Sequence, residues 1–214
     1  MGEASWIIQR ATWGISSVMR LTSDDHTLQS VIMTLTPTLW RTCRVLANSK
    51  RLSLLYYVMA TPFVSVSQVA SALQLPLPVA SQYMRALNAR GLLKVKRQGR
   101  FVLYEAAADP SMPETSILLK ALESTMRTAD PLQMAVEALT GFTHPRRIEL
   151  LRALDGDGTD IPSLGKKTGI STPALVRHLR KLRRRGYIKS CRGKYACARP
   201  NAVLARALLA LALQ

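Results

Sequence analysis

The sequence has few acidic residues, and they are unevenly placed. It contains 30 lysine and arginine residues against 13 aspartate and glutamate residues, so its formal net charge is +17 at pH 7. No acidic residue occurs between Asp25 and Glu105, and none follows Asp160. Because a solvated surface normally mixes both signs of charge, these two basic stretches indicate contact with a polyanion: DNA, RNA or an anionic membrane surface.

Cysteines, aromatic residues and long apolar runs are also scarce. The three cysteines are Cys43, Cys191 and Cys197, and their odd number without a CxxC pair argues against a disulfide framework and for a reducing cytoplasm. The three histidines are scattered as well, so we expect neither a metal site nor a cofactor. No apolar run is long enough to cross a bilayer, and we expect no membrane partner.

Patterns typical of enzymes are missing. The sequence has no glycine-rich phosphate loop, no nucleophile motif and no paired carboxylates outside its acidic middle. Residues 155–160 (DGDGTD) resemble part of a calcium loop, but the downstream glutamate that such a loop requires is absent. We therefore expect a polar loop before a helix at this point, and a protein without enzymatic activity.

The chain contains an internal repeat. Residues 46–58 (LANSKRLSLLYYV) resemble residues 142–154 (FTHPRRIELLRAL), and residues 65–93 resemble residues 160–188. Arg51 aligns with Arg147 in the first block, and Gly91 aligns with Gly186 in the second, so the offset changes by only one residue. A nearly constant offset over two blocks predicts a tandem duplication.

Each repeat shows the same order of expected elements. In the first, apolar spacing predicts a helix over residues 50–59 capped by Ser49, a short helix capped by Ser65, a helix over residues 78–89, and strands over 92–97 and 100–104 around Gln98 and Gly99. In the second, the equivalents are helices over residues 146–154 and 161–168, a helix capped by Ser171 and ended by Gly186, and strands over 188–192 and 194–198.

The two long helices that precede the expected hairpins each have an apolar face. The inner positions are Ala80, Met84 and Leu87 in the first repeat, and Leu175, Leu179 and Leu182 in the second. The remaining polar residues are expected on the outer face, and they are Ser81, Gln82, Arg85, Arg177, His178, Arg180 and Lys181.

A helix, a short helix, a third helix and a basic hairpin form the order of a winged helix-turn-helix. We therefore predict a mainly α fold with small β-hairpin wings (α+β), in which two tandem winged helix-turn-helix domains form a pseudo-dimer. The predicted segments are an N-terminal helical extension (1–36), a first domain (37–110), a linker with a dimerisation-type helix (111–130), a second domain (131–200) and an apolar packing helix (201–214). The last is expected to pack on the helix predicted at residues 114–129.

The motifs of both units resemble the ArsR-like winged-helix regulators. The stretches that carry the resemblance are LANSKRLSLL, SVSQVASAL, VASQYMRALNARGLL and KRQGRFVLY in the first unit, and HPRRIELL, STPALVRHLRKLRRRGYI and CRGKYAC in the second. Family members usually pair as homodimers and contact bases near a Ser-Gln/Arg-His-Leu stretch. This resemblance implies base contacts by Ser81, Gln82, Arg177 and His178, with Tyr83 in place of the usual histidine.

We accordingly predict a cytoplasmic, nucleoid-associated transcription regulator that binds an asymmetric site in double-stranded DNA. Helices in the major groove contact bases, and wing cations contact phosphates. The predicted contacts from the recognition helices are Ser81, Gln82, Arg85, Thr172, Arg177, His178 and Lys181. The predicted contacts from the wings and to phosphates are Lys94, Lys96, Arg97, Arg100, Arg184, Lys189, Arg192 and Lys194.

Three other functions remain open at this point. A sequence-tolerant architectural protein would bind random DNA with similar affinity, and the arginine-rich end of the second long helix favours it slightly. A protein-interaction module would tend to lose its basic wings, which this chain keeps. RNA binding is disfavoured because A-form RNA hides its major groove from a helix. The sequence contains no pattern that identifies an effector. Whether two chains pair with each other is a further open alternative.

Overall fold

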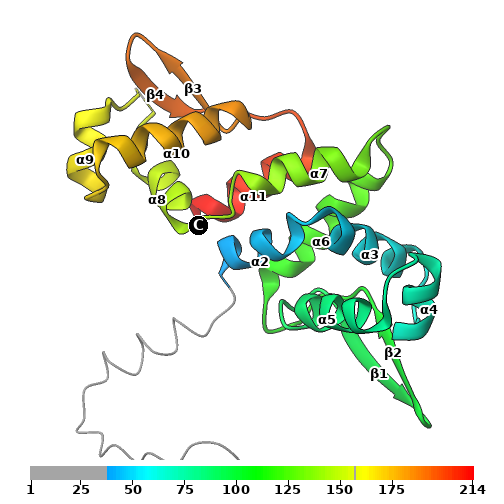
Figure 1. The fold of residues 1–214 in the computed structure, drawn as a ribbon. Coiled ribbons are helices and arrows are strands. Elements are labelled where there is room, and N and C mark those ends of the chain that lie inside the picture. The colour runs from blue at the N-terminus through cyan, green and yellow to red at the C-terminus, as the bar shows by residue number, and fades with distance from the viewer. Residues whose placement is uncertain (1–37, 157) are drawn as a thin grey trace, which may run out of the picture. The chain divides into compact units, whose positions relative to one another are not determined.

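The computed structural model describes residues 38–156 and 158–214, which form helices and two small hairpins (Figure 1). The expected N-terminal extension and Asp157 of the DGDGTD segment lie outside these residues. No helix in the described ranges is both long and apolar enough to cross a membrane. The elements are α2 (Leu39–Leu46), α3 (Ser49–Ala60), α4 (Val66–Ala72), α5 (Leu77–Asn88), β1 (Lys94–Gln98), β2 (Phe101–Glu105), α6 (Pro113–Met126), α7 (Pro131–Thr140), α8 (Pro145–Ala153), α9 (Ile161–Thr168), α10 (Thr172–Arg184), β3 (Ile188–Cys191), β4 (Lys194–Cys197) and α11 (Val203–Leu213).

The order of elements from α2 to α6 recurs from α7 to α11. In each series, four helices precede an antiparallel hairpin and another helix follows it. This arrangement fits the predicted class, a mainly helical α+β fold with winged helix-turn-helix character. The long helix before each hairpin, α5 or α10, stands where a recognition helix is expected.

Local sequence signals set the helix starts. Ser65 and Gln68 form a reciprocal capping box at α4, as Ser65 Oγ accepts the Gln68 amide and the Ser65 amide donates to Gln68 Oε1. The prediction for α3 is wrong by one residue, because Asn48, in extended backbone, accepts the Arg51 amide at 2.9 Å and leaves Ser49 as the first helical residue. Ser171 takes the N-cap position of α10, but its side chain makes no capping hydrogen bond.

The two hairpins close on different turns. In the second, Cys191 pairs with Lys194, and the loop residues Arg192 and Gly193 both have positive φ (48° and 75°), as the sequence predicted for this loop. In the first, Gln98 pairs with Phe101, so the loop is Gly99 and Arg100 rather than Gln98 and Gly99. The shift puts Gly99, at φ 58°, at the first loop position, where a turn of type II′ requires glycine.

The predicted inner faces of α5 and α10 are buried. Ala80, Met84 and Leu87 are fully inaccessible, as are Leu175 and Leu182, and Leu179 is nearly so. These side chains join a core of aliphatic residues that runs through both halves. The helical spacing of apolar residues therefore identified the core-facing stripes correctly.

Helix α11 joins the two halves. It packs on α6, as predicted, and also contacts α7 and α8 (Figure 1). Its buried residues Leu204, Leu208 and Leu211 belong to the same core as Leu118 and Leu122 of α6. Helix α2 likewise packs on α7, so elements that occupy the same place in the two series contact each other.

Two arginines make similar contacts at the helix corners. Arg147 donates from Nε to the Gly141 carbonyl at 2.6 Å and from Nη2 to the Thr140 carbonyl at 3.1 Å. Arg51, its counterpart in the repeat, donates from Nη1 to the Val45 carbonyl at 2.9 Å. Gly141 and Val45 each lie six residues before their arginine, so each arginine satisfies carbonyls at the end of the preceding helix.

Tyr187 connects the end of α10 with α7. The side chain is fully buried, its hydroxyl donates to the Ala138 carbonyl at 3.0 Å, and its ring meets Phe142 edge to face with centroids 4.5 Å apart. Gly141 lies directly against this ring, and a methyl group built on Gly141 would overlap it. The absence of a side chain at Gly141 therefore allows this contact.

We expect Gly141→Ala to lower the free energy of unfolding by about 1–3 kcal/mol, because the added methyl group must displace the Tyr187 ring. Gly165→Ala is the matched control, since the new Cβ would meet Leu175 at an ordinary 3.6 Å, and alanine within α9 should raise stability by about 0.5–1 kcal/mol. Urea denaturation measures both effects. Equal midpoints for Gly141→Ala and the wild type would contradict the packing described.

Candidate nucleic-acid interface

The exposed face of α10 carries mainly positive charge. Thr172 lies exposed in its first turn, and Lys181 is half-buried in its last turn. The fully exposed cations of the helix are Arg177, Arg180, Arg183 and Arg184. This face lies opposite the buried leucine stripe, so packing of α10 on the core turns the arginines toward solvent.

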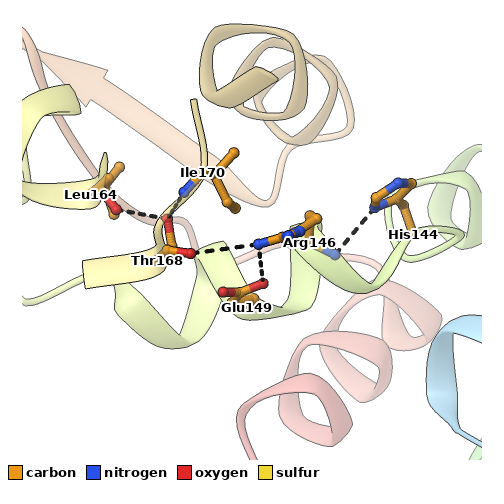
Figure 2. A network of polar contacts seen from close by, with 6 residues as sticks. All are labelled: His144, Arg146, Glu149, Leu164, Thr168 and Ile170. Atoms are coloured by element: carbon orange, nitrogen blue, oxygen red, sulfur yellow. Dashed lines mark hydrogen bonds and ion pairs between the residues drawn. The ribbon is translucent and has the colours of Figure 1, made fainter. Parts of the chain in front are cut away.

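Contacts from α8 hold the turn that leads into α10 (Figure 2). His144 caps α8 by accepting the Arg146 amide at Nδ1, at 3.2 Å. The Arg146 guanidinium reaches both Glu149 and the Thr168 carbonyl at 3.5 Å, and the Thr168 hydroxyl accepts the Ile170 amide at 3.4 Å. The network joins the start of α8 to the end of α9, one turn before α10.

A cavity of about 390 Å³ lies beside α10 and has no acidic residue in its wall. Burial lowers the pKa of Lys181, and the nearby charges of Arg185, Arg147 and Arg184 lower it further. Such an environment attracts an anion, since each cation is stabilised when negative charge enters. The residues that line the cavity are His144, Arg147, Arg177, His178, Arg180, Lys181 and Arg184.

His178 does not lie where the sequence predicted. It was expected on the outer face of α10, but it is only 5% exposed and its ring centroid lies 4.7 Å from that of His144. The reason is its spacing, three residues after Leu175 and four before Leu182, which places it beside the inner stripe. Tyr83 of α5 is comparable, as it is half-buried with the Arg51 guanidinium 5.0 Å from its ring.

Helix α5 offers a less charged face than α10. Gln82 and Arg85 are exposed and Ser81 is half-buried, so the three predicted contacts of the first unit reach one side of the helix. Arg85 donates from Nε to the Ser81 carbonyl at 3.4 Å. Arg85 is the only cation on this helix, so α5 and α10 present different side-chain chemistry.

Both hairpins expose all of their predicted cations. These are Lys94, Lys96, Arg97 and Arg100 in the first hairpin and Lys189, Arg192 and Lys194 in the second. Within the described residues, the ion pairs are Arg146–Glu149, Arg185–Glu137 and Lys167–Asp155, and none involves a predicted wing or phosphate contact. None of these cations therefore forms an ion pair with a carboxylate of the described residues, although Lys94 lies near Asp109 and Lys194 near Asp160.

The structure adds two cations that the predicted contact set does not include. Arg147 and Arg180 both line the cavity beside α10. Arg180 follows Arg177 by three residues, a spacing that places both on one helical face and is visible in the sequence. Arg147 comes from α8, and its position beside α10 depends on tertiary packing.

Exposed cations on a helix and on the hairpin that follows it define a winged helix-turn-helix nucleic-acid-binding surface. The family model described as bacterial regulatory protein, arsR family, matches residues 144–190, from the cap of α8 into β3. Searches of the curated proteins and of the solved structures gave no match. The matched segment is thus similar to an ArsR-type helix-turn-helix, which supports a DNA-binding transcription regulator.

We expect stability to fall as the pH falls from about 6.5 toward 4. Burial, then the charges of His144, Arg147, Arg177 and Arg146, lower the pKa of His178 to about 4, and burial with nearby arginines also lowers the pKa of His144. Because both folded-state pKa values lie below the unfolded value of about 6.5, the unfolded state binds protons first and gains population.

Chemical denaturation of the wild type and of His178→Gln at several pH values measures this dependence. The wild type should lose on the order of 2–3 kcal/mol across this window through His178, and the variant should lose clearly less. Identical pH profiles for the two proteins would show that His178 is not held in its neutral form.

Proposed function

We propose that the chain is a transcription regulator that binds one asymmetric double-stranded DNA site with both α5 and α10. The observation that carries this proposal is the presence of two helix–hairpin units with exposed cations in one compact unit, Pro37–Gln214. A single helix-turn-helix offers one short contact with DNA, whereas two joined units contact two half-sites.

The proposed pairing of the two units follows the logic of a homodimer. In a two-fold interface, the same surface contacts itself, so equivalent elements meet. The contacts of α2 with α7 and of α6 with α11 support this arrangement, because these elements hold the same place in the two series. We infer that a tandem duplication has placed both halves of a dimer in one chain.

The proposed role of α10 combines base and phosphate contacts. Arg177 is exposed on the helix, and arginine donates two parallel hydrogen bonds to guanine O6 and N7. Thr172 and Lys181 extend the surface along the helix, and the cation-lined cavity accommodates a backbone phosphate. His178 is left out of the base contacts because it is buried, and its proposed role is to pack against His144.

The proposed role of α5 is to contact a different half-site. Gln82 is exposed, and glutamine pairs with adenine N6 and N7 in the major groove. Ser81 and Arg85 lie beside it on the same helix. Because α5 and α10 carry different side chains, the DNA half-sites that they prefer differ, and no catalytic step is part of this function.

A second candidate is sequence-tolerant binding of DNA. The observation that favours it is the density of arginines around the cavity beside α10, since phosphate contacts carry no sequence information. The two candidates differ in their dependence on base sequence, and both predict strong dependence on salt.

We expect the wing cations to set the salt dependence of DNA affinity. Lys189→Ala and Lys194→Ala should each weaken binding to all duplexes and reduce the slope of log affinity against log salt by about 1. Lys167→Ala is the matched control, because Lys167 Nζ already lies 2.6 Å from Asp155 Oδ2. Fluorescence anisotropy over a range of salt concentrations measures these slopes, and an unchanged slope in both wing variants would refute the phosphate contacts.

We expect Arg177→Ala to reduce both the affinity and the sequence preference of DNA binding, and Arg180→Ala to reduce the affinity alone. Loss of Arg177 should cost about 1–3 kcal/mol of binding to the preferred duplex and relax the preference at one base pair. Loss of Arg180, a cavity residue one turn further along, should weaken binding equally for preferred and substituted duplexes. Competition binding with single-base-pair substitutions measures this, and equal losses across all duplexes for Arg177→Ala would favour the sequence-tolerant function.

A further inference from the structure

Beyond the backbone bridge that anchors each hairpin, the first hairpin extends two residue pairs further than the second. In each half, one backbone bridge ties the second strand to the segment before the short helix: Val64 with Tyr104, and Thr159 with Tyr195. Between the bridged tyrosine and the loop, the first hairpin has three further pairs and the second has one, Cys191 with Lys194. At about 3.4 Å per residue, the first hairpin reaches roughly 7 Å further from the core.

The additional length carries apolar side chains. Its two pairs are Arg97 with Val102 and Gln98 with Phe101. Phe101 is 55% exposed and Val102 is 40% exposed. The pair that closes the second hairpin, Cys191 with Lys194, places a cation where the first hairpin places Phe101 beside its loop.

The charged residues of the hairpin between Lys94 and Tyr104 are all cations. The Arg100 guanidinium lies 5.2 Å from the centre of the Phe101 ring. At the base of the hairpin, Lys96 Nζ lies 4.9 Å from the ring of Phe63, which is itself 45% exposed and has a left-handed φ of 61°. The partner that fits this surface must therefore offer apolar contact and negative charge within a few ångströms of each other.

The groove of a DNA duplex has both properties. Its phosphates flank the sugars and base edges, and proteins that enter the minor groove insert apolar wedges between base steps and kink the duplex. A second copy of the hairpin fits worse, because it would bring two sets of four cations together: Lys94, Lys96, Arg97 and Arg100.

We propose that the first hairpin enters the minor groove at one end of the site and that Phe101 wedges against a base step there, bending the DNA at that end alone. The inference rests on the proposed DNA-binding function. The second hairpin, shorter and without an exposed aromatic ring at its tip, follows the phosphate backbone without bending the duplex. The bend is a second source of asymmetry, separate from the side chains of α5 and α10.

Energy transfer between dyes at the two ends of a short duplex measures bending, and 2-aminopurine placed at steps along the site measures loss of stacking. The full chain is compared with Phe101→Ser, Phe101→Leu and Ile117→Ser. Ile117 is the matched control, because it is 43% exposed on α6, away from the hairpin. Phe101 lies at an exposed tip, so thermal melting should show that the fold is unchanged in its variants.

The wild type should raise energy transfer, and 2-aminopurine fluorescence should rise at one end of the site only. Phe101→Ser should bind with less than roughly tenfold loss of affinity yet lose most of both signals. Phe101→Leu should keep part of them, and Ile117→Ser all of them. Equal bending by the wild type and Phe101→Ser, or a wild-type complex without bending, would overturn the wedge and leave DNA binding intact. Absence of any DNA binding by the wild type would overturn both.

Discussion

The arrangement of the two helix–hairpin units depends on the burial of α11 against α6. The apolar faces of both helices are removed from water only when the two helices pack together. Leu208 and Leu118 are fully inaccessible in this contact. The Arg152 side chain reinforces this contact by donating from Nε to the Ala212 carbonyl at 2.7 Å. Since the halves share one core, the geometry between α5 and α10 is set by packing rather than by association with another chain.

The ion pairs that the few carboxylates of the described residues form lie outside the two hairpins. In the described residues, carboxylates pair with Arg146, Lys167 and Arg185, which lie beside the helix corners and the end of α10, while the hairpins keep their charge. Burial, together with the nearby positive charges, also lowers the pKa of both His144 and His178. The positive charge is thus concentrated where a polyanion is expected to bind, at some cost to stability at low pH.

Local patterns in the sequence predicted most of the helices, the apolar inner faces of α5 and α10 and the second hairpin turn, because spacing and cap residues act over a few positions. Helices α2 and α7 were not predicted. The inward position of His178 was missed, although its spacing from Leu175 and Leu182 was visible in the sequence. Two features required tertiary information. Arg147 joins the cation-lined cavity from another helix, and the greater reach of the first hairpin is evident only from the bridges of Tyr104 and Tyr195. The contacts of individual cations with DNA stay predictions.

Selection from a random duplex library at near-physiological salt, with sequencing of the retained DNA, tests the central claim most directly. The account predicts one asymmetric motif whose two halves differ, and binding by a single chain per site. Enrichment of a palindromic motif occupied by two chains would contradict the idea that both halves of a dimer lie in one chain. Retention without enrichment would contradict base contacts by α5 and α10, and no retention would contradict DNA binding itself.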